Sequence, residues 1–139
     1  MKTAPRILLS CEHASRAVPR AMLQHFRSPS LRGALTSHRG WDLGAAGVAR
    51  ALARELHAPL HEGSHTRLLA DLNRSAHHPR VLGPWAQALG SVERRTVLAR
   101  WHAPWRRAFA ARLNTALAGG RPALHLSIHS FTPILNGAR

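Results

Sequence analysis

The chain has 139 residues, of which 45% are hydrophobic, so it can form one domain with a buried core and does not belong to the disordered class. Lys and Arg number 20 and Asp and Glu number 6, a formal charge of +14 that favours anionic partners such as nucleic acid, a membrane surface or an acidic substrate. A single cysteine excludes a disulfide within the chain and favours a reducing compartment, the cytoplasm. The short apolar run near the N-terminus excludes a signal-peptide core or a membrane span.

The first third of the chain predicts one strand and one short helix. Residues 6–10 (RILLS) are typical of a buried strand, and the polar pair Glu12 and His13 follows them directly. Residues 19–26 predict a short helix. Residues 27–41 are rich in Ser, Pro and Gly and predict a loop with at most one helical turn.

The middle of the chain predicts a helix and two short strands. Asp42 is expected to open the helix, where a carboxylate interacts favourably with the positive end of the helix dipole, and Pro59 to end it. Residues 60–61 and 66–70 (TRLLA) predict short strands, and the second leads into the polar sequence DLNR.

The last third predicts one long helix and a final strand. Proline and glycine indicate a loop over residues 75–90, after which Ser91 is expected to cap a helix that Pro104 kinks. A glycine pair stops this helix, and residues 122–128 (PALHLSI) then predict a buried strand that ends at His129.

The alternation of strands and helices predicts an α/β domain with a mainly parallel sheet. Polar clusters follow three of the predicted strands, at Glu12 and His13, at residues 71–74, and at His129 and Ser130. Because the carboxyl ends of parallel strands meet at one edge of a sheet, we expect these clusters to form a single site.

Two of the 11 histidines stand out because each directly follows an apolar strand. His13 and His129, together with one carboxylate and an open fourth position, would make a hydrolytic zinc site. Asp42 is the favoured carboxylate and Glu12 the alternative. Glu12 is adjacent to His13, so an extended backbone points the two side chains to opposite faces.

A second group suits the binding of an anion. Arg67 and Arg74 can each hold a carboxylate through two parallel hydrogen bonds, Asn73 adds a neutral donor, and Asp71 can orient one of them. The alternative interpretation of residues 71–74 is an ordinary turn, in which Asp and Asn are frequent for local reasons.

Four sequence blocks, in this order, resemble the N-formylglutamate amidohydrolase family: SCEHAS at 10–15, HRGWDLGA at 38–45, RLLADLNRS at 67–75 and IHSFTPILNG at 128–137. That family is similar in fold to zinc carboxypeptidases and zinc amidases. The resemblance implies a three-layer α/β/α sandwich with a Zn²⁺ site at the strand ends and activity on an N-acyl amino acid such as N-formylglutamate.

Carried over residue by residue, the resemblance implies that His13, Asp42 and His129 bind the metal. It further implies that Asn73 and Arg74 hold the substrate carboxylate. Arg67 would bind a second carboxylate or polarise the scissile carbonyl.

The chain departs from the related families at two points. Carboxypeptidases have a Glu three residues after their first His ligand, where this chain has Arg16, so the acid ligand is either Asp42 or Glu12. Family members also usually continue past the last block into a strand that supplies the general base. We therefore expect residues 1–139 to form a single, incomplete domain in which Glu12 is the nearest candidate base.

Two hypotheses from other classes remain. The charge alone is compatible with a basic nucleic-acid-binding protein, but the arginines are scattered and no nucleic-acid-binding signature occurs, so no specific nucleic acid is expected. The chain is also compatible with a catalytically inactive remnant or binding module, whose uncovered sheet edge would favour a homo-oligomer.

Overall fold

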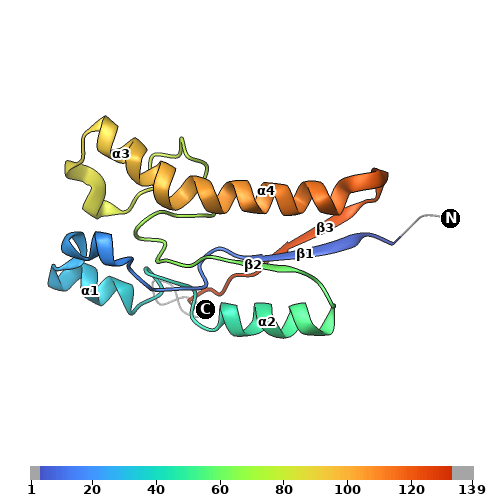
Figure 1. Ribbon diagram of the computed structural model, residues 1–139. Helices are drawn as coiled ribbons and strands as arrows, with labels where there is room; N and C mark the ends of the chain where they lie inside the picture. Colours follow the sequence, from blue (N-terminus) through green and yellow to red (C-terminus); the bar gives the residue numbers. More distant parts are fainter. Residues whose placement is uncertain (1–3, 133–139) are drawn as a thin grey trace.

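The computed structural model describes residues 4–132 and has the predicted α/β architecture. Three parallel strands, β1 (Arg6–Cys11), β2 (Leu60–Glu62) and β3 (Ala123–Ser127), form a sheet in the order β2-β1-β3. In the register of the longer pair, Ser10 of β1 lies opposite Ser127 of β3. All three strands therefore end at the same edge (Figure 1).

Helices cover both faces of this sheet and complete the three layers. The helix α2 (Ala45–Glu55) lies on one face and α4 (Ala103–Leu117) on the other (Figure 1). The central strand is consequently buried on both sides, with Leu8 and Leu9 at 1% and 0% exposure, which is why its sequence is continuously apolar and does not alternate.

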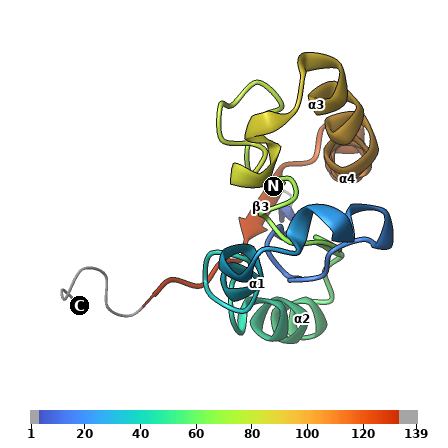
Figure 2. The same ribbon diagram turned by 90° about the vertical axis from the view of Figure 1, so that its left-hand side faces the viewer.

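Shorter elements gather beyond the carboxyl ends of the strands (Figures 1 and 2). They are η1 (Arg20–Phe26), α1 (Pro29–Leu35), η2 (Pro84–Ala88) and α3 (Ser91–Val97). A second apolar cluster, built on Met22, Phe26, Leu68 and Leu69, packs beneath them. This cluster fixes the loops around the strand ends.

The predicted strand at residues 66–70 is wrong, because this segment is a buried turn. Its backbone groups bond to loops: the amide of Thr66 donates to the carbonyl of Ala17, and the carbonyl of Leu68 accepts from the indole of Trp85. An apolar run of five residues fits a buried loop as well as a strand when other loops and side chains satisfy its polar atoms.

The helix predicted to open at Asp42 begins three residues later, at Ala45. Gly44 is its N-cap, with a φ of 81° that a glycine adopts without strain. Asp42 is thereby released from capping, and its side chain turns towards the strand ends. Likewise, residues 29–35 form the helix α1, capped by the hydroxyl of Ser28, where a loop was predicted.

The long C-terminal helix is interrupted just before Pro104, close to the predicted kink. A π-helical turn, η3 (Leu98–His102), separates α3 from α4, and the 3-10 turn η4 (Ala118–Gly120) follows α4. Gly90, and not Ser91, caps α3. None of the helices within residues 4–132 combines the length and apolar character that crossing a bilayer requires.

Candidate metal centre

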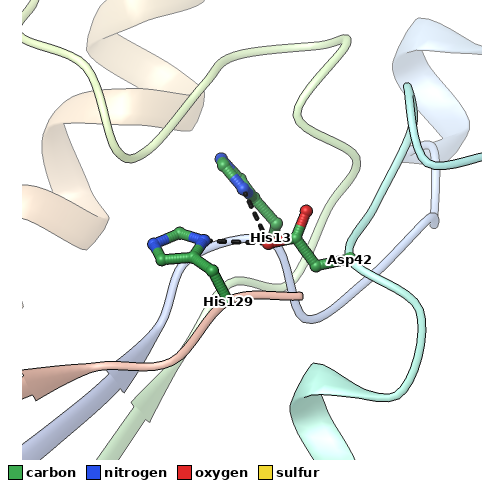
Figure 3. Close-up of side chains that lie close together, drawn as sticks. All are labelled: His13, Asp42 and His129. Atoms are coloured by element: carbon green, nitrogen blue, oxygen red, sulfur yellow. Dashed lines mark hydrogen bonds and ion pairs between the residues drawn. The ribbon is translucent and has the colours of Figure 1, made fainter. Parts of the chain in front are cut away.

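Three side chains from distant parts of the chain meet at the carboxyl edge of the sheet (Figure 3). His13 follows β1, Asp42 precedes α2 and His129 follows β3. Oδ2 of Asp42 lies 2.8 Å from Nδ1 of His129 and 3.4 Å from Nδ1 of His13. Potential ligand atoms of the three residues all lie within 4.8 Å of one another.

The donor set suits a zinc ion. Two imidazole nitrogens and one carboxylate, with a fourth position left open, are typical of hydrolytic zinc sites. His13 and Asp42 are buried at 2% and 5% exposure, and a carboxylate lying this close to two ring nitrogens requires a cation or a proton between them. The residues present therefore fit the metal that the sequence predicts.

The far nitrogen of His13 is held by Asp71. Nε2 of His13 donates to Oδ1 of Asp71 over 2.7 Å, because an ionised carboxylate only accepts. A metal-binding histidine usually donates its other ring N–H to a carboxylate, which fixes the tautomer and the ring orientation. In this arrangement Nδ1 of His13, which faces Asp42, is the ring nitrogen available to a metal.

Asp71 is itself held by two guanidinium groups. Its Oδ2 accepts from Nη2 of Arg67 at 3.2 Å and from Nε of Arg74 at 3.0 Å. Its Oδ1 also accepts from the backbone amide of Asn73 at 3.1 Å. Asp71 is buried, with 4% of its surface exposed, and it connects the candidate metal ligand His13 to the predicted anion-binding residues Arg67 and Arg74 through hydrogen bonds.

The pKa values of these groups follow from burial opposed by hydrogen bonding. Burial alone would raise the pKa of Asp42, but hydrogen bonds from His129 and His13 lower it far below its usual range. Burial would likewise raise the pKa of Asp71, and the bond from His13 with the charge of Arg67 lowers it. Burial would lower the pKa of His13, but its bonds to Asp42 and Asp71 raise it. Both carboxylates are thus ionised near neutral pH.

A hollow of about 240 Å³ opens over these ligands. Besides the three candidate ligands, Arg67, Asn73 and His38 line it. Its size suits the reacting end of a small molecule. The guanidinium of Arg67 lies 3.5 Å from Oδ1 of Asp42, so a cationic donor stands beside the metal position.

A second hollow of about 290 Å³ adjoins the first, and Arg67 lines both. Five guanidinium-bearing residues and one carboxylate line it: Arg39, Arg67, Arg74, Arg80, Arg94 and Asp71. Such an excess of positive charge in a concave surface attracts anions.

Five of the site residues predicted from the sequence line the first hollow: His13, Asp42, His129, Arg67 and Asn73. Arg74 lines only the arginine-rich second hollow.

Glu12 lies on the other side of His129. Its Oε2 is 3.4 Å from Nε2 of that ring, and Glu12 does not line the hollow. Of the two alternative acids, Asp42 is therefore the one that faces both Nδ1 atoms.

Three residues of the site were not predicted from the sequence: His38, Ser10 and Ser127. His38 lies four residues before Asp42 in the same sequence block, and the two serines contact Glu12. Asp71 was expected to orient an anion-binding residue, but its contact with His13 was not predicted. The signal for the serines is alternation, because residues two apart on a strand share a face.

Comparison with known proteins agrees with these features. The family model described as N-formylglutamate amidohydrolase matches residues 5–139. The crystal structure of gene product Atu2144 from Agrobacterium tumefaciens is similar, with a TM-score of 0.83 and 31% sequence identity over 96% of this chain. The match spans 55% of that protein, so this chain corresponds to about half of it. A search of the curated proteins finds no match.

Proposed function

The chain belongs to the N-formylglutamate amidohydrolase family, and from this membership and the geometry of the site we propose that it acts in the zinc-dependent hydrolysis of an N-acyl amino acid such as N-formylglutamate. The observation that carries the proposal is the convergence of His13, Asp42 and His129 in a hollow that is also lined by the hydrogen-bond donors Arg67 and Asn73. When bound there, zinc supplies Lewis acidity and makes a water molecule nucleophilic near neutral pH.

The protein's own residues position the substrate. Arg67 stands beside the metal position and can donate to the carbonyl oxygen of the scissile amide, where negative charge develops in the transition state. Asn73 lines the same hollow, and its amide can donate to the substrate's α-carboxylate. These roles need no rearrangement of the three metal ligands.

The arginine-rich hollow supports the proposal of an acidic amino-acid substrate. N-formylglutamate carries two carboxylates, and an arginine holds a carboxylate through two parallel hydrogen bonds. Arg74 uses its Nε and Nη1 on Asp71 and His78, so it has spare N–H groups on Nη2. With Arg67 shared between the hollows, a substrate can place its amide in one and its side-chain carboxylate in the other.

Hydrolysis also requires a base that takes the proton of the attacking water. His38 lines the hollow and is accessible to that water, whereas both oxygens of Glu12 already accept hydrogen bonds from serines. Within the described residues, His38 is therefore better placed than Glu12 to accept the proton.

The test is metal content followed by turnover. Elemental mass spectrometry of the purified chain should find about one zinc per chain, lost in His129→Ala and kept in His77→Ala, an exposed histidine outside the site. Formate release should then be faster from N-formyl-L-glutamate than from N-formyl-L-alanine. Equal zinc in wild type and His129→Ala would refute the ligand assignment, and zinc binding without formate release would refute the activity.

A further inference from the structure

Glu12 sits at the centre of a symmetric hydrogen-bonded group. The side chain is 5% exposed and follows β1. Its Oε1 accepts from the hydroxyl of Ser10 at 2.7 Å, and its Oε2 accepts from the hydroxyl of Ser127 at 2.8 Å. The two serines are register partners on neighbouring strands, so the sheet itself places one on each carboxylate oxygen.

Each serine also contacts a histidine, and the single hydrogen of the hydroxyl determines which partner donates in that contact. Oγ of Ser10 lies 2.8 Å from Nε2 of His125, and Oγ of Ser127 lies 2.9 Å from Nε2 of His129. A hydroxyl has one hydrogen, and here each serine gives it to the carboxylate. Its oxygen can then only accept, so the imidazole must donate its Nε2–H.

For His129 this direction determines which nitrogen is left for a metal. Nδ1 of His129 lies 2.8 Å from Asp42 at the candidate metal position and donates to that carboxylate. A bound zinc would take the place of this hydrogen, and a neutral ring with its hydrogen on Nε2 then has its lone pair on Nδ1. The chain from His129 through Ser127 to Glu12 would therefore hold the ligand atom towards the metal, as Asp71 does for His13 on the other side.

We propose that Glu12 is a positioning residue, which acts through Ser127 to hold His129 with Nδ1 directed at the metal, and that it is not the proton acceptor of the reaction. The proposal rests on the proposed zinc site. The two functions exclude each other on geometric grounds: Glu12 is buried, both its oxygens accept hydroxyl hydrogens, and it does not line the hollow where water and substrate would bind.

The other half of the group provides a matched control. His125 contacts Ser10 in the way that His129 contacts Ser127, and Ser10 likewise donates to Glu12. The ring of His125, however, packs against Phe109 of α4, with ring centroids 4.7 Å apart. Replacing Ser10 thus removes the same kind of bond from a histidine that binds no metal. Ser10 is 0% exposed whereas Ser127 is exposed, so general destabilisation would make Ser10→Ala the more damaging change.

The experiment compares zinc affinity, measured by competition with a chromogenic chelator, in Ser127→Ala, Ser10→Ala, Glu12→Gln and wild type. Loss of an outer partner of a ligand typically costs 10- to 100-fold in metal affinity, and we expect this for Ser127→Ala and Glu12→Gln. Ser10→Ala should bind zinc more tightly than Ser127→Ala, and Ser127→Thr, which restores the hydroxyl, should recover most of the affinity. Glu55→Gln, the same change at an exposed carboxylate, should match wild type.

Equal losses in the two alanine variants, or a Ser127→Ala protein that binds zinc like wild type, would overturn the proposal. Ring N–H signals in nitrogen-15 NMR spectra of the metal-free protein give an independent test. The Nε2–H signal of His129 should be protected from exchange in wild type and Ser10→Ala but not in Ser127→Ala. If wild type binds no zinc but shows this pattern, the zinc proposal fails and the positioning role of Glu12 stands; if the pattern is absent, the positioning role fails.

Discussion

Replacing Asp71 by Asn should destabilise the protein strongly, although the two side chains have nearly the same shape. The carboxylate accepts from His13, Arg67 and Arg74, and an amide can accept on only one of its two heavy atoms. Its NH₂ group would face N–H donors in a site where the replaced residue is 4% exposed. The variant therefore leaves two half-buried guanidinium groups without the carboxylate they share, and only Arg67 keeps another, Asp42 at 3.5 Å.

The expected magnitude follows from the number of partners and their burial. Removing one partner of a buried ion pair costs about 3–5 kcal/mol. The two arginine side chains are 29% exposed, so water replaces part of what they lose, and about 3 kcal/mol is expected. With a urea m-value of about 2 kcal/mol/M, the unfolding midpoint should fall by about 1.5 M.

The assay is urea unfolding followed by circular dichroism, with a chelator present so that metal binding does not contribute. Glu62→Gln is the matched control, because Glu62 pairs with Arg50 at 2.9 Å at a more exposed position, and such pairs contribute about 0–1 kcal/mol. If Asp71→Asn and Glu62→Gln lower the free energy of unfolding equally, the four hydrogen bonds to Asp71 do not stabilise the site as argued.

Three further predictions test other parts of the structure. Burial lowers the pKa of His65 from 6.5 to about 4, so the unfolded chain binds a proton first as the pH falls, and about 2 kcal/mol of stability should be lost between pH 7 and pH 5. His65→Leu should remove that part of the pH dependence in urea titrations, and an unchanged slope would contradict the assignment. A Cβ at Gly63 would overlap the carbonyl oxygen of Glu12, so Gly63→Ala should cost about 1–3 kcal/mol, whereas Gly47→Ala, which has open space, should not destabilise. Arg80→Gln should lower kcat/KM for N-formylglutamate by about tenfold while leaving N-formylalanine unaffected, since about 1.4 kcal/mol of carboxylate binding is lost; equal losses on both substrates would argue against an acidic subsite.

The sequence predicted the sheet and its flanking helices because their signals are local. The run RILLS, the helical repeat after Gly44 and the run PALHLSI each identify an element without reference to the rest of the chain. Residues 66–70 were misassigned for the opposite reason. Their hydrogen-bond partners, on Ala17, Gly40 and Trp85, are 17 to 49 positions away, and no local pattern encodes them.

The residues of the candidate site that follow strands could be predicted from the sequence, because parallel strands end at the same edge of the sheet. Glu12 and His13 follow β1, and His129 follows β3, so parallel pairing alone brings them together. Asp71 reaches the same edge from a turn, which explains why its bond to His13 was not anticipated. The direction of each hydrogen bond, and hence the ring nitrogen left for a metal, depends on side-chain geometry that only the structure supplies.

The two polar residues that directly follow β1 have different tasks. His13 turns towards Asp42 and Asp71, and Glu12 turns towards Ser127 on the neighbouring strand. Each candidate histidine ligand thus has its own buried carboxylate, one direct and one through a hydroxyl. All of these groups lie within the described residues, so zinc affinity can be tested on this chain independently of turnover, and a failure of hydrolysis would not by itself count against the metal centre.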